Sequence, residues 1–104
     1  MHADIAEKRQ DLMELCRRYG VERLEVFGSG ARGADFDPAR SDADFLVTFS
    51  SHARDDLSVF ADFKESLEAA LGRPVDLAER EAIETSRNII RRRRILAEAE
   101  AVYG

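Results

Sequence analysis

The feature that most constrains this chain is a glycine-rich segment held between two apolar stretches. Val26-Phe27 leads into Gly28-Ser29-Gly30, and the second stretch, Ser41–Val47, carries carboxylates at Asp42 and Asp44. The apolar stretches predict strands, and the glycines predict a tight turn that ends the first strand. We therefore expect a strand, a glycine turn, a loop and a second strand, with an anion-binding turn beside a divalent-metal site.

The glycine turn is suited to bind phosphate. A Gly-Ser-Gly turn after a strand exposes backbone N–H groups that no side chain covers, and a helix that begins there adds its dipole. Ser29 supplies a hydroxyl donor, and Arg32 is close enough in sequence to hold phosphate oxygens with its guanidinium. By itself the Gly28–Gly30 turn also fits a plain end to a strand, so its function depends on what lies beside it.

Three aspartates are the candidate metal ligands. Asp42 and Asp44 are two residues apart on the second predicted strand, so their side chains share one face, with Cα atoms roughly 6–7 Å apart. Two such carboxylates repel each other unless a cation lies between them, and oxygen ligands suit Mg²⁺ or Mn²⁺. Asp76, in the apolar segment Pro74–Leu77, could complete the site and accept a proton from an attacking hydroxyl. Alone, each aspartate also fits a solvated position at a strand edge.

Apolar periodicity predicts an α/β chain (α and β mixed) in which helices flank a three-stranded mixed sheet. Gly20 and Gly72 lie where helices are expected to end, and Asp4 is the expected cap of the first helix. The run Phe45-Leu46-Val47 predicts a strand covered on both faces. The expected elements are a helix over 4–19, strands over 21–27 and 42–49, a helix over 56–71, a strand over 74–78, and helical structure from 79 to the end with a break near 85–86.

Composition narrows the class of protein. A chain of 104 residues, 44% hydrophobic and 36% charged, is typical of one soluble domain, here 1–104. No stretch approaches the ~20 apolar residues of a membrane span, and the first residues lack a signal-peptide pattern. A single cysteine, Cys16, favours a buried reduced thiol in a cytoplasmic protein. The net charge of −5 argues against direct nucleic-acid binding, which needs clustered Lys and Arg.

The basic run Arg91–Arg94 is the main departure from this acidic balance. Four consecutive residues on a helix fan about 100° apart, so they cannot form one contact face. We expect the run to be solvated or to meet a partner, and an acidic partner surface is one hypothesis.

In combination, three segments resemble a known family. Gly28-Ser29-x-x-Arg32-Gly33, Ser41-Asp42-x-Asp44-Phe45-Leu46-Val47 and Val75-Asp76-Leu77 look like the minimal nucleotidyltransferases of the DNA-polymerase-β-like superfamily, and specifically like the antitoxins of HEPN/MNT toxin–antitoxin pairs. The resemblance covers most of the chain and implies the polymerase-β-like nucleotidyltransferase fold. It also implies that Gly28 and Ser29 hold the nucleoside triphosphate, that Arg32 supports the phosphates or the loop, and that Asp42, Asp44 and Asp76 bind Mg²⁺.

The resemblance implies an activity as well. Members of this family transfer AMP from ATP to a hydroxyl and release pyrophosphate. In the antitoxin branch the acceptor is a tyrosine of a partner HEPN ribonuclease toxin, which implies a hetero-oligomer. Two alternatives remain open: an antitoxin that neutralises the toxin by binding alone, and a nucleotidyltransferase for a small molecule or an RNA end.

Overall fold

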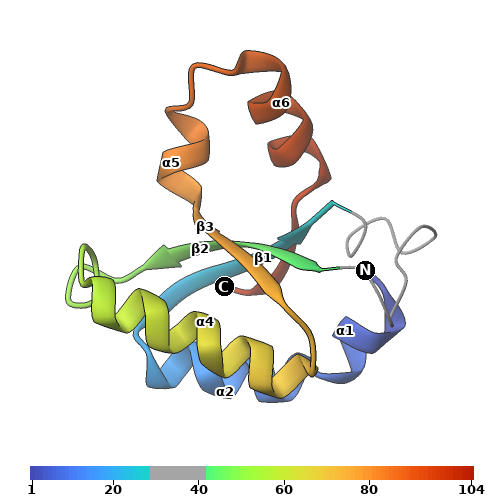
Figure 1. The fold of residues 1–104 in the computed structure, drawn as a ribbon, viewed down its shortest axis with the longest axis vertical. Coiled ribbons are helices and arrows are strands. Elements are labelled where there is room, and N and C mark those ends of the chain that lie inside the picture. The colour runs from blue at the N-terminus through green and yellow to red at the C-terminus, as the bar shows by residue number, and fades with distance from the viewer. Residues whose placement is uncertain (29–41) are drawn as a thin grey trace.

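The computed structural model describes residues 1–28 and 42–104 as a mixed sheet with helices on both faces (Figure 1). In chain order the elements are α1 (Ala3–Glu7), α2 (Arg9–Arg18), β1 (Val21–Phe27), β2 (Ala43–Phe49), α4 (Leu57–Leu71), β3 (Val75–Glu79), α5 (Arg80–Glu84), α6 (Ile89–Glu98) and β4 (Glu100–Tyr103). The strands lie in the order β3-β2-β1-β4, where β2 and β3 are parallel and the other pairs antiparallel. The predicted α/β class is confirmed, although the described residues form four strands, not three.

The additional strand, β4, corrects the prediction that the chain stays helical to its end. α6 ends at Glu98, and the next residues pair with β1, so that Ala101 lies opposite Glu25. Val102 is fully buried, and its carbonyl oxygen accepts a hydrogen bond from Arg9 Nε at 3.1 Å. Strand β4 covers a backbone edge of β1 that would otherwise be unpaired. The pairing of β4 with β1 is a long-range contact, so the apolar spacing within a four-residue segment does not indicate it.

The N-terminal helix also differs from the prediction. A break at Lys8 divides the expected single helix into α1 and α2. His2, not Asp4, caps α1, because the backbone N–H of Asp4 donates to His2 Nδ1 at 3.1 Å. Asp4 lies within the first turn, and its carboxylate is 3.6 Å from the guanidinium of Arg73. A residue inside the turn is past the position from which a side chain can cap.

Helix α4 connects β2 to the parallel strand β3. Asp56 caps its start by accepting hydrogen bonds from the backbone N–H groups of Ser58 (3.0 Å) and Val59 (3.3 Å). Gly72 ends it with φ of +66°, the left-handed conformation that glycine adopts without strain. Both helix ends are therefore as predicted. Nowhere in 1–28 or 42–104 is a helix both long and apolar enough to cross a lipid bilayer.

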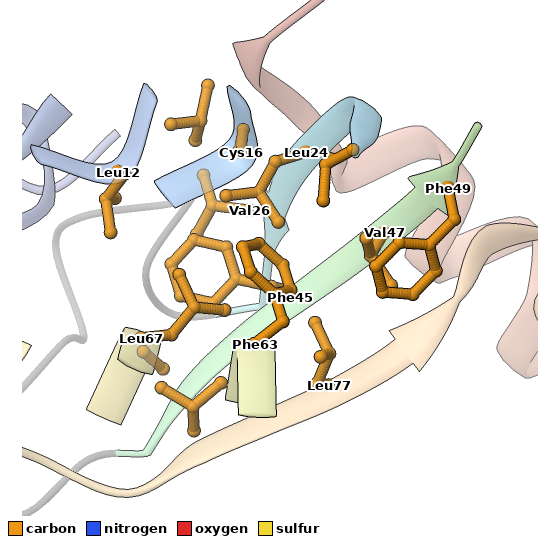
Figure 2. Packing of buried hydrophobic residues seen from close by; sticks show 14 of the residues in the cluster. Leu12, Cys16, Leu24, Val26, Phe45, Val47, Phe49, Phe63, Leu67 and Leu77 are labelled. Carbon is orange, nitrogen blue, oxygen red and sulfur yellow. The ribbon is translucent and has the colours of Figure 1, made fainter. Parts of the chain in front are cut away.

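The main core lies between the sheet and helices α2 and α4 (Figures 1 and 2). Phe45 and Phe63 are its largest fully buried side chains. The Phe63 ring packs edge-on against Phe49, at 5.9 Å between centroids, and tilted against Tyr19, at 5.7 Å. Cys16 is a buried free thiol, as predicted, and burial raises its pKa to about 12. It therefore stays protonated at neutral pH and is no nucleophile.

The opposite face of the sheet carries α5 and α6, on the side away from α2 and α4 (Figure 1). A smaller apolar cluster holds them there, formed by Phe27, Leu46, Ile83 and Ile95. Phe45 packs in the main core while Leu46 packs in this second cluster. Both faces of β2 are thus buried, as its continuous apolar run predicts.

A buried ion pair also ties α5 to β1. The Glu25 side chain is 3% exposed, and both its carboxylate oxygens accept hydrogen bonds from Arg80 Nη1 at 2.6 Å. The hydrogen bond and the negative charge of Glu25 raise the pKa of Arg80. Arg23 lies further away, with its Nη2 at 3.5 Å from Glu25. Arg80 is therefore the main partner of the buried Glu25 carboxylate.

We expect Phe63→Ala to lower the free energy of unfolding by about 3–5 kcal/mol, because it leaves a cavity between α4 and the sheet. Urea unfolding followed by circular dichroism measures this loss. Leu57→Ala, on the same helix but 84% exposed, is the control and should stay within about 0.5 kcal/mol of wild type. Equal losses in the two variants would contradict this description of the core.

We expect Arg80→Met to destabilise the fold by about 3–5 kcal/mol, because it leaves the Glu25 carboxylate buried without its partner. The double variant Glu25→Leu, Arg80→Met should recover most of that loss, since no charge then remains to be solvated. Urea unfolding of the two proteins side by side measures both effects. An Arg80→Met protein as stable as wild type would contradict the importance of this pair.

Candidate active site

A cleft of about 320 Å³ opens where the C-terminal end of β1 meets the N-terminal ends of β2 and β3. Helix α6 forms its other wall. Among the described residues, those that line it are Phe27, Gly28, Asp44, Asp76, Arg91, Arg94, Ile95 and Glu98. The cleft is thus mostly polar, and it brings together segments far apart in the sequence.

Strand register places two of the predicted aspartates side by side. Asp44 and Asp76 are direct partners in the parallel β2–β3 pair. Two residues further on, Leu46 and Ala78 pack in the cluster beneath α5 and α6. Because side chains alternate along a strand, Asp44 and Asp76 share that face, and their Cα atoms are about 4.8 Å apart across the strands. The strand expected over 74–78 is therefore the neighbour of β2, and this brings Asp76 next to Asp44.

Asp42 lies just outside this pair. Strand β2 begins at Ala43, so Asp42 precedes it by one residue; it is exposed and does not line the cleft. Ala43 is fully buried on the main-core face. The alternation of the strand, extended by one residue, gives Asp42 the same face as Asp44.

Gly28 brings the backbone against the first of the two aspartates. Its φ of +66° is one that residues with a side chain rarely adopt, and a Cβ here would lie 2.7 Å from Asp44 Oδ2. Glycine therefore leaves open the space beside a carboxylate that any other residue would fill. Ser29 and Arg32, the other two predicted nucleotide ligands, lie outside the described residues.

The sequence agrees with a protein family over most of its length. Residues 9–97 match the family described as Nucleotidyltransferase domain. The chain belongs to this family. It is a nucleotidyltransferase, as its motifs predict.

Individual relatives agree with this assignment. The chain is 39% identical over 72 residues to the protein adenylyltransferase MntA of Thermococcus cleftensis, a match that covers 69% of each chain. It is 33% identical to a solved structure described as a minimal nucleotidyltransferase, with a TM-score of 0.72 over 96% of this chain and 95% of that one. A structure of the toxin–antitoxin pair MntA–HpeT matches at 15% identity, with a TM-score of 0.66 over 92% of this chain and 72% of that one, which shows the shared fold.

Nucleotidyltransferases of this kind use a divalent metal ion, and the carboxylates of the cleft suit one. Asp44 and Asp76 offer adjacent oxygen ligands, and Gly28 leaves room beside Asp44. Across 1–28 and 42–104, no three His, Cys, Asp or Glu residues are grouped closely enough to hold a metal ion. Of the three predicted ligands, the structure pairs Asp44 with Asp76 and leaves Asp42 at the start of the strand.

Helix α6 contributes residues to the cleft that the sequence motifs do not indicate. Arg91, Arg94 and Glu98 recur at spacings of three and four residues, so they share one helix face, and that face lines the cleft. The buried Ile95 lies between them and docks the helix in the cluster with Phe27. The apolar residue Ile95, directly after the basic run, is the signal in the sequence that indicates the side of the helix that faces the sheet.

A second hollow, of about 420 Å³, lies toward the opposite ends of β2 and β3. It is larger but chemically unsuited to a nucleotide. Glu22, Glu79, Glu81 and Glu84 line it, and Arg54, the cation among its described lining residues, is hydrogen-bonded to Glu81. A polyphosphate would be repelled there, so the smaller cleft is the candidate active site.

We expect Gly28→Ala to reduce nucleotidyl transfer strongly while the protein stays folded. The new methyl group must displace the Asp44 carboxylate, and a side chain at this positive φ costs about 1–2 kcal/mol. Transfer assays combined with thermal unfolding separate the two effects. Gly72→Ala, at the same φ but with no atom within 4 Å, is the matched control and should keep full activity. A fully active Gly28→Ala protein would argue against this site.

Proposed function

We propose that this nucleotidyltransferase is a protein adenylyltransferase that acts as an antitoxin. It transfers AMP from ATP to a tyrosine hydroxyl of a partner HEPN ribonuclease toxin, in a reaction that depends on Mg²⁺ or Mn²⁺. The observation that carries the proposal is the in-register pair Asp44–Asp76 beside Gly28, because it supplies metal-binding oxygens next to an open backbone turn. The 39% identity to an enzyme named as a protein adenylyltransferase supports a protein acceptor.

Each predicted residue has a role in this proposal. Asp42 and Asp44 hold the metal ion, and Asp76 completes the site from the neighbouring strand. The backbone at Gly28 and Ser29 holds the triphosphate, and Arg32 supports it. When bound, the metal ion would neutralise charge that develops on the phosphate oxygens.

The chemical step is an in-line displacement. The tyrosine oxygen attacks the α-phosphorus of ATP, a new P–O bond forms, and the bond between the α- and β-phosphates breaks to release pyrophosphate. The hydroxyl proton passes to the carboxylate of Asp76, which is exposed and thus within reach of a partner's side chain. The AMP group would then remain on the toxin and, together with complex formation, silence it.

The proposal includes a setting. A single domain spanning 1–104 would form a hetero-oligomer with its toxin in the cytoplasm, without binding nucleic acid directly. The chain's net charge of −5 supports the last point, because phosphate backbones bind clustered positive charge.

We expect Asp44→Asn to lower AMP transfer about 100-fold or more, because it removes a charged metal ligand. The measurement is transfer of label from ATP labelled at the α-phosphate to the co-purified toxin. Asp62→Asn, which makes the same change at an exposed position on α4, should transfer at the wild-type rate.

Two outcomes would contradict parts of this proposal. Full transfer by Asp44→Asn would exclude the mechanism. A tight complex in which the toxin is never modified by wild-type protein, yet is inhibited, would favour neutralisation by binding alone. Mass spectrometry of the partner from co-expressed cells distinguishes modification of the toxin from neutralisation by binding alone.

A further inference from the structure

Two arginines of α6 face the same cleft as the aspartate pair. Arg91 and Arg94 are one helical turn apart and both line it, together with Gly28, Asp44 and Asp76. The position of α6 is well defined at both ends of this face. Asn88 caps the helix by accepting a hydrogen bond from the backbone N–H of Arg91 at 3.1 Å, and Ile95 is 2% exposed in the cluster beneath.

The four arginines of the run differ in what they do. Arg92 donates from Nη1 to the carbonyl oxygen of Ser86 at 3.1 Å, so it stabilises the turn before α6. Arg93 is exposed and does not line the cleft. Within the described residues, the guanidinium groups of Arg91 and Arg94 make no hydrogen bond or ion pair. Two cationic groups thus face the cleft without a hydrogen-bond or ion-pair partner among residues 1–28 and 42–104.

The charges of the cleft indicate what these two arginines could bind. Its described carboxylates are Asp44, Asp76 and the half-buried Glu98, which already has an interaction of its own. A nucleoside triphosphate is a polyanion, so those carboxylates alone would repel it. Guanidinium groups bind phosphate through paired, charge-assisted hydrogen bonds. Arg91 and Arg94 place that chemistry on the wall opposite the strands.

We propose that Arg91 and Arg94 bind the β- and γ-phosphates of the nucleoside triphosphate and stabilise pyrophosphate as it leaves. This inference rests on the proposed placement of the nucleotide beside Gly28 and Asp44, but not on the identity of the acceptor. It assigns to half of the basic run a role in the chemistry, where a solvated or partner-facing role was expected. Helix α6 then forms the phosphate-binding wall of the site.

Calorimetric titration of the toxin-free protein with ATP, ADP and AMP in the presence of Mg²⁺ tests the proposal. We expect Arg91→Gln and Arg94→Gln each to weaken ATP binding about 10- to 100-fold, the range for a lost charge-assisted hydrogen bond. AMP binding should change by less than about 2-fold, because AMP lacks both phosphates. Inhibition of transfer by added pyrophosphate should weaken in parallel with ATP binding.

Matched variants remove simpler explanations. Arg93→Gln makes the same change in charge on the same helix and should bind ATP as wild type does. Arg91→Lys and Arg94→Lys keep the charge without the planar fork, so they should recover part of the lost affinity. Circular dichroism of each variant confirms that α6 still forms.

Several results would overturn the inference. Equal losses for Arg93→Gln would show a general charge effect, and equal losses for ATP and AMP would show that the phosphates are not what the arginines bind. Arg91→Gln and Arg94→Gln proteins that bind ATP normally but no longer bind the toxin would make this face a docking surface. The proposed acceptor is tested separately. If these variants lose ATP affinity but the wild-type protein never modifies a toxin, this inference is supported and only the adenylylation of the toxin is contradicted. Wild-type protein that binds no ATP at all would overturn both.

Discussion

The site depends on the register of one parallel strand pair. β2 and β3 place Asp44 opposite Asp76, and the same register puts Leu77 opposite Phe45 in the main core. Because side chains alternate between the two faces, a slip of one residue would turn Asp76 into that core and Leu77 out of it. The burial of apolar neighbours therefore determines where the carboxylates point. Helix α4 makes the pair possible, since parallel strands need a crossover connection (Figure 1).

The second layer of helices turns this edge of the sheet into a cleft. The apolar cluster around Ile95 and the buried pair Glu25–Arg80 hold α5 and α6 on the face where the aspartates lie. With α6 docked in this way, Arg91 and Arg94 come to face the carboxylates of Asp44 on β2 and Asp76 on β3. An acidic chain can thus offer positive charge to a small polyanion, because only two cations in one place are needed. Nucleic-acid binding would require such charge over a much larger surface.

Local signals in the sequence predicted a large part of the fold. β1 spans the predicted residues, and α4 begins and ends at Asp56 and Gly72 as expected, because its caps are contained in its own sequence. Alternation predicted which residues of one strand share a face, but not that Asp44 lies opposite Asp76, which depends on strand register. The failures lie where distant segments compete with local preference. β4 forms because β1 offers an unpaired edge. The cap of α1 is a smaller, local error: it is His2 and not Asp4, because the helix begins at Ala3.

The sequence by itself determined which chemical groups are present and in what order: a glycine turn, two alternating carboxylates, a third on a later strand, and a basic run. These features belong to segments of a few residues, where backbone geometry decides which side chains share a face. Only the tertiary structure decided which of those groups meet. It paired Asp44 with Asp76 through strand register and brought Arg91 and Arg94 to the same cleft through the docking of α6. Such contacts depend on the packing of both faces of the sheet, which no single segment encodes.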